Sequence, residues 1–127
     1  MESTRLFQII KDAAFEVRKH LYAGYLESVY QNALAVELKK RGLSVSKEID
    51  IPVYYKDEII GNFRADLVVE NSIILEIKAV KELNIIHEAQ LVNYLTATGL
   101  DYGFLINYGG EKYRIIFKTR IYSPPKT

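Results

Sequence analysis

The spacing of apolar residues predicts two helices near the N-terminus. Helical periodicity begins behind Ser3 and Thr4, either of which can act as an N-cap. A second periodic segment follows Gly24 and ends at three cations and Gly42, which is typical of a helix C-terminus because cations complement the dipole and glycine accepts a left-handed conformation. The apolar positions are Leu6, Ile9, Ile10, Ala13, Val17 and Leu21 in the first helix, and Leu26, Val29, Tyr30, Ala33, Leu34 and Leu38 in the second.

The pattern then changes to period two, which predicts that a β-sheet begins near residue 45. Pro52 indicates that the first strand lies at a sheet edge or contains a bulge. Strands follow at 59–69 and 73–80, and the polar turn 70–72 between them predicts an antiparallel hairpin. The first strand is expected to place one set of side chains on a single face, namely Val45, Ile49, Ile51, Val53 and Tyr55.

A third helix and two closing strands complete the predicted order. Residues 85–98 return to helical spacing, and Gly99 is placed to end that helix. Strands at 102–108 and 112–118 are joined by Gly109 and Gly110, and the tail from about residue 121 is predicted to be loose. We find no repeat or linker, so the 127 residues predict one domain.

Composition narrows the class of protein and its compartment. Hydrophobic residues make up 49% and charged residues 26%, the balance of a folded globular chain. The chain has no cysteine, which excludes disulfides, thiolate catalysis and cysteine-based zinc sites, and it suits the cytoplasm. Charges throughout the first helix argue against a signal peptide or a membrane span. The net charge of +1 supplies no global attraction to nucleic acid, so any such contact must be local.

The predicted hairpin carries three charged residues that could act together. Period-two alternation places Glu76 and Lys78 on the same face of the second strand. If Val69 pairs with Ile73, Asp66 lies opposite Glu76, whereas a two-residue loop would turn Asp66 away. A functional reading of these residues requires the first register, or one shifted by two.

Two adjacent carboxylates repel each other unless a cation lies between them or one takes up a proton. Oxygen ligands from carboxylates and a carbonyl suit Mg²⁺ or Mn²⁺. A neighbouring lysine could orient or deprotonate a metal-bound water, and these groups together suit phosphodiester hydrolysis. The alternative is an ordinary surface hairpin on which Asp66, Glu76 and Lys78 form weak cross-strand ion pairs.

A resemblance to a known family enters with residues 24–30, which read G-x-x-E-x-x-Y. The chain resembles the GxxExxY family of PD-(D/E)XK nuclease-like proteins, and the likeness continues through 64–66, 76–78 and 87–95, with Ala65 in place of the proline in the superfamily's name. The resemblance implies an α/β (α+β) restriction-endonuclease-like fold. Its α-β-β-β-α-β core would have a mixed sheet flanked by helices, an N-terminal helix pair and a C-terminal hairpin.

The same resemblance implies roles for individual residues. Asp66 and Glu76 would be metal ligands, and Lys78 would be the catalytic lysine. Our hypothesis for the metal site adds the Ile77 carbonyl as a further ligand. The helix-borne acid and the accessory group would be Glu27 and Gln90, and Glu27 shares a helix stripe with Tyr30 and Leu34. His87 and Tyr94 lie on one stripe with Gln90 and are weaker candidates for substrate contacts, His87 as a structural hydrogen-bonding residue or a phosphate contact.

The leading hypothesis is a magnesium- or manganese-dependent nuclease that hydrolyses phosphodiester bonds in DNA or RNA. One alternative is a non-catalytic domain with a nuclease-like fold that binds nucleic acid or a protein. Another is an enzyme that acts on a smaller phosphate ester. A homodimer could enlarge the binding surface, although no sequence feature establishes one.

Overall fold

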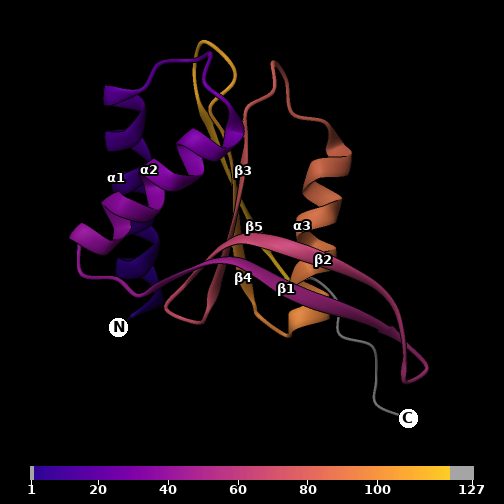
Figure 1. Ribbon diagram of the computed structural model, residues 1–127. Helices are drawn as coiled ribbons and strands as arrows, with labels where there is room; N and C mark the ends of the chain where they lie inside the picture. The colour runs from indigo at the N-terminus through magenta and orange to yellow at the C-terminus, as the bar shows by residue number, and fades with distance from the viewer. Residues whose placement is uncertain (1, 121–127) are drawn as a thin grey trace.

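The computed structural model describes residues 2–120, which form three helices and five strands (Figure 1). In chain order the elements are α1 (Ser3–His20), α2 (Glu27–Lys40), β1 (Val45–Tyr55), β2 (Glu58–Val69), β3 (Ile73–Lys78), α3 (Ile85–Thr98), β4 (Tyr102–Asn107) and β5 (Arg114–Thr119). The predicted loose tail lies outside the described residues.

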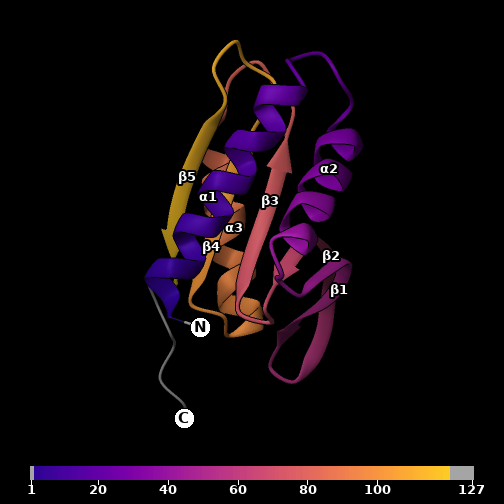
Figure 2. The ribbon, with the colours of Figure 1, turned by 90° about the vertical axis from the view of Figure 1, so that its left-hand side faces the viewer.

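The strands form one mixed sheet in the order β1-β2-β3-β4-β5. β3 and β4 run parallel, whereas the other neighbouring strands are antiparallel. Helices α1 and α2 cover one face of this sheet and α3 covers the other (Figures 1 and 2). The predicted α+β architecture, with its N-terminal helix pair and C-terminal hairpin, is therefore confirmed.

Apolar side chains form two cores, one on each face of the sheet. Leu67, Leu75 and Phe104 belong to the core beneath α1 and α2. Ile74 and Leu105, which occupy the alternate positions of β3 and β4, pack with Leu91 and Leu95 of α3.

The helix ends agree with the sequence except at the first N-cap. Gly42 and Gly99 have φ values of 86° and 76°, so both adopt the left-handed conformation predicted for helix termini. The prediction of Ser3 or Thr4 as N-cap is wrong, because both residues are already helical and Glu2 occupies the cap without a side-chain hydrogen bond. Glu2 is not among the preferred capping residues, so the rule for capping residues placed this boundary too late.

The predicted single face of β1 is also wrong. Val45 packs against the core beneath α1 and α2, whereas Ile51 belongs to the core beneath α3, and Ile49 and Tyr55 are exposed. Between them Glu48 has a φ of 54°, a left-handed conformation that interrupts the extended backbone and changes which face the following residues present. The expectations from Pro52 are confirmed, because β1 is an edge strand and carries an irregularity between Val53 and Tyr54.

Several strand ends differ from the predicted bounds. β3 ends at Lys78 rather than at residue 80, because the Val80 N–H donates to the Asn107 side chain at 3.0 Å instead of continuing the ladder. β4 and β5 span 102–107 and 114–119, since Gly109 and its neighbours form the connection.

None of the helices within residues 2–120 has the combination of length and apolar character that crossing a bilayer demands.

Gly109 packs so closely on the segment after β3 that we expect alanine to be poorly tolerated there. An added Cβ would lie 2.3 Å from the backbone N and O of Val80. We predict that Gly109→Ala lowers the free energy of unfolding by about 1–3 kcal/mol, measured by urea denaturation. Gly61→Ala is the control, because a Cβ there would meet nothing within 4 Å. Equal stability of the two variants would contradict the close packing.

Candidate metal-binding and active site

The hairpin of β2 and β3 has the register that the functional reading requires. Val69 pairs with Ile73 across the turn 70–72, and the pairing continues to Leu67 and Leu75. The next position of the same register places Asp66 opposite Glu76. The two carboxylates therefore lie side by side on adjacent strands, on the side of the sheet that α3 covers.

The backbone ladder between β2 and β3 ends where these carboxylates begin. Beyond Leu67 and Leu75 no further pair is formed, and the Ile77 N–H donates instead to Asp66 Oδ2 at 2.7 Å. The carboxylate thus takes the position of a backbone acceptor and is held against β3. On its other side the Asp66 carbonyl accepts a 3.4 Å hydrogen bond from Gln31 Nε2 of α2.

Glu76 is the most unusual group in this arrangement. Its side chain is buried, with a residue exposure of 6%, and Oε1 has no hydrogen-bond partner among the described residues. Burial first, and then the neighbouring Asp66, raise the pKa of Glu76 to about 9, while Lys78 opposes the shift. Without a metal ion, Glu76 therefore holds a proton at neutral pH. A bound divalent cation would reduce the repulsion between the two carboxylates, as that proton does.

Lys78 and Glu27 extend the site toward the end of the sheet at which β3 terminates. Lys78 is half-buried and lies on the Glu76 face of β3. The pKa of Glu27 is raised, mainly by loss of hydration, and it is affected in opposite directions by Lys78 and Asp66. The Ala79 N–H and His87 also favour its ionised form. As a residue Glu27 is nonetheless exposed.

The start of α2 is fixed by the residues that precede and follow Glu27. Gly24 has a φ of 120°, and its neighbour Tyr25 donates its backbone N–H to the Tyr30 hydroxyl at 3.2 Å. The same hydroxyl donates to the Tyr22 carbonyl at 2.5 Å. Tyr30 and Leu34 are fully buried, whereas Glu27 is the exposed end of the stripe that the three residues share.

The three candidates on α3 occupy different surroundings. His87 Nδ1 accepts the Asn84 N–H at 3.1 Å and so completes a capping box, which matches the structural role considered for it. Burial raises the pKa of Tyr94, and the carboxyls of Glu76 and Asp66 add to the shift, so Tyr94 lies beside the acidic pair. Gln90 is exposed and takes part in no side-chain hydrogen bond recorded between residues 2 and 120.

Two buried polar residues near the site were missed by the sequence reasoning. Gln31, four residues after Glu27, has an exposure of 7% and contacts Asp66, as described above. Asn107 accepts the N–H groups of Val80 and Gly109 and donates to the Val80 carbonyl at 2.9 Å, so it fixes the segment after Lys78. A polar residue that ends the apolar run 104–106 was the available signal for Asn107.

Comparisons with known proteins bear on the fold and on the family. A search of curated proteins finds no match. Among solved structures, the crystal structure of SSO0001 is similar, with a TM-score of 0.61 and 19% identity over 79% of this chain. This chain spans only 52% of that one, and at such identity the likeness supports the fold alone.

The family comparison reaches further along the chain. A model described as the PD-(D/E)XK nuclease superfamily matches residues 4–118, which include all five strands almost completely. Nucleases of that superfamily generally use divalent metal ions. The mixed sheet, the flanking helices and this match together define a restriction-endonuclease-like fold. The chain belongs to the PD-(D/E)XK nuclease superfamily.

Proposed function

We propose that this protein is a divalent-metal-dependent nuclease that hydrolyses phosphodiester bonds in DNA or RNA. The observation that carries the proposal is the buried carboxyl of Glu76, whose Oε1 has no partner among the described residues although it lies opposite Asp66. A buried polar atom without a partner is costly unless a ligand completes its surroundings. Lys78 lies on the same face of β3, where its positive charge would interact with a phosphate or with the attacking water.

The residues present fit Mg²⁺ or Mn²⁺. Asp66 and Glu76 would hold the ion through carboxylate oxygens, with the Ile77 carbonyl as a third candidate ligand. Residues 2–120 contain no group of three histidine, cysteine, aspartate or glutamate side chains gathered as a ready-made site. This agrees with Mg²⁺, which keeps several waters and is commonly bound by one or two carboxylates plus substrate phosphate.

The side chains around the pair divide the remaining work. A bound divalent ion lowers the pKa of water and neutralises charge that develops on the phosphate. Lys78 would orient the attacking water or hold a phosphate oxygen, and Glu27 would accept a hydrogen bond from Lys78 or from that water. His87 uses Nδ1 in the capping box, so its Nε2 would be the atom that contacts a phosphate. Gln90 is proposed as an accessory group from the resemblance, and its exposed position gives this role the least support.

We also propose that the chain is a GxxExxY protein within the superfamily. The contacts around the three positions that name the signature support the proposal. Gly24 adopts a φ of 120°, and the Tyr30 hydroxyl makes hydrogen bonds to the backbone of Tyr22 and Tyr25, on either side of Gly24. Glu27 begins the helix that follows this loop. A signature with this physical basis would present one carboxylate to Lys78.

A non-catalytic binding domain is the second candidate function. The net charge of +1 favours it, because a nuclease without global attraction must bind its substrate through local contacts. The single domain, the cytoplasmic compartment and a homodimer likewise stay predictions.

Manganese binding and nucleic-acid cleavage, measured on the same preparations, test the proposed function. We expect wild type to bind Mn²⁺ in calorimetry and to cut a mixture of DNA and RNA substrates. Asp66→Ala should lose both below detection, because one carboxylate cannot replace the pair. Asp50→Ala removes an exposed carboxylate of β1 and should change neither. Wild type that neither binds Mn²⁺ nor cuts would favour the binding domain.

A further inference from the structure

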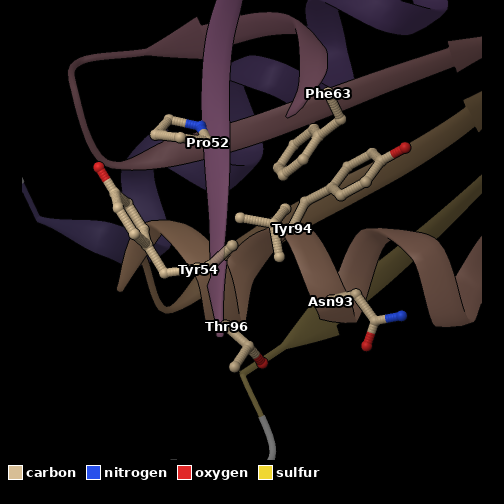
Figure 3. Close-up of a pocket in the computed structure, with 8 residues that line it drawn as sticks. Pro52, Tyr54, Phe63, Asn93, Tyr94 and Thr96 are labelled. Carbon is tan, nitrogen blue, oxygen red and sulfur yellow. The ribbon is translucent and has the colours of Figure 1, made fainter. Parts of the chain in front are cut away.

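A second feature lies beside the carboxylate site, in the cleft between the β1–β2 hairpin and α3 (Figure 3). Its volume is about 610 Å³, within the range of small-molecule sites. The lining residues include Pro52, Tyr54, Phe63, Asn93, Tyr94 and Thr96, and none of the lining side chains carries a formal charge. A phosphate would find no cation in this cleft, whereas an uncharged ring would fit it.

Aromatic rings form the walls of the cleft. Phe63 of β2 and Tyr94 of α3 stack with ring centroids 3.6 Å apart and planes inclined by 11°. Tyr54 of β1 also lines the cleft and is 60% exposed, so its ring has open surface for a partner (Figure 3). Such rings provide stacking surfaces for bases of any sequence, because every base has a π-face.

The polar groups of the cleft complement the edge of a base. The Asn93 amide carries both donors and an acceptor, and its side chain takes part in none of the hydrogen bonds recorded for residues 2–120. Thr96 donates its hydroxyl proton to the Val92 carbonyl at 3.0 Å, which leaves its oxygen able to accept. A purely aliphatic ligand would use neither group.

Tyr94 lies between the cleft and the proposed catalytic site, because it lines the cleft and packs against the core that contains Ala65, the residue before Asp66. The Tyr94 ring forms part of the aromatic wall, and its hydroxyl lies within the electrostatic influence of Glu76 and Asp66. Phe63, the cleft residue of β2, precedes Asp66 by three positions and packs against the same core as Leu91 of α3. A nucleotide with its phosphate at the carboxylates could therefore extend its base toward the cleft.

We propose that this cleft binds an unpaired nucleobase next to the phosphate that is cut, so the substrate is single-stranded nucleic acid or a strand with unpaired nucleotides at the cleavage position. The proposal rests on the nuclease function and adds the substrate class to it. Bases within a duplex are stacked and paired, so a base reaches such a cleft only after extrusion, which costs the free energy of unstacking and unpairing. An unpaired base avoids the cost of breaking a base pair.

Two adjacent tyrosines of similar exposure provide a matched test. Tyr54 lines the cleft and Tyr55 does not, and they are 60% and 59% exposed. The probes are a fluorescein-labelled oligothymidylate, its duplex with oligoadenylate and an abasic strand of equal length, titrated by anisotropy in EDTA. We expect Tyr54→Ala to weaken oligothymidylate binding by about 5- to 100-fold. Tyr55→Ala should stay within about twofold, and neither change should alter abasic-strand binding.

The outcomes distinguish this proposal from the nuclease function. Mn²⁺ binding and cleavage that persist in Tyr54→Ala, together with unchanged oligothymidylate affinity, would overturn the base cleft and leave the nuclease. Equal wild-type affinity for duplex and oligothymidylate would also overturn it, and so would weaker binding of the abasic strand by Tyr54→Ala. Absence of Mn²⁺ binding and cleavage in wild type would instead overturn the nuclease function, whatever the tyrosine variants do.

Discussion

Replacing Lys78 with methionine is expected to lower the rate of cleavage by about 10²–10⁴-fold while leaving Mn²⁺ affinity within a few-fold of wild type. The ammonium lies on the Glu76 face of β3 and interacts with the carboxyls of Glu76 and Glu27. Methionine keeps much of the side-chain length and removes the charge, so the metal ligands stay in place. Single-turnover cleavage at saturating Mn²⁺, with calorimetry on the same sample, separates the two quantities.

Lys81 offers a matched control for this experiment, because it is an exposed lysine in the segment that follows β3. Lys81→Met removes one positive charge from the same region and should change cleavage by less than about threefold. If both variants lose activity equally, Lys78 contributes only to the local charge. If Lys78→Met keeps full activity, the lysine has no part in the reaction.

Replacing Glu76 with glutamine is expected to abolish metal binding and, in the absence of metal, to stabilise the protein at alkaline pH. The unfolded chain releases the Glu76 proton near its ordinary pKa of 4.5, whereas the folded protein retains it until about pH 9. Between these values unfolding releases a proton, so the free energy of unfolding of wild type falls as pH rises. One such group changes it by at most about 1.4 kcal/mol per pH unit.

Glutamine cannot ionise, so Glu76→Gln should lose this part of the pH dependence. Urea denaturation at pH 6 and pH 8 in EDTA measures the difference, and added Mn²⁺ should stabilise wild type alone. Glu82→Gln, at an exposed position after β3, should behave as wild type does. A wild-type stability that does not fall between these two pH values would contradict the buried, protonated carboxyl.

The central part of the site could be predicted from the sequence because β3 is short and regular. Ile73, Leu75 and Ile77 all belong to the core beneath α1 and α2, as strict alternation requires, and this leaves Glu76 and Lys78 together on the opposite face. The turn 70–72 then determined the register that sets Asp66 opposite Glu76. These are local properties, which a single sequence contains.

Other features depend on contacts between distant residues, and these could not be predicted. The sheet face on which the side chains of β1 lie changes at Glu48, because the backbone of this residue is left-handed. Glycine is the usual sequence signal of that conformation, and position 48 is not a glycine. Gln31 reaches Asp66 from α2, and Asn107 binds Val80 across 27 positions. A polar side chain in an apolar pattern suggests that a partner exists, but the packing of the elements decides which group it is.

The end of the β2–β3 ladder at Leu67 and Leu75 also determines how local unfolding can spread. Beyond that point β1 and β2 pair only with each other, from Ile49 and Ala65 to the hairpin turn. A two-stranded ribbon is marginally stable by itself, so this one depends on the packing of its apolar residues against α3. Fraying can therefore begin at the tip of the ribbon and stop at Asp66, while β3 and β4 stay paired. The part of the sheet that can unfold first and the part that stays paired therefore meet at Asp66, which we propose as a metal ligand.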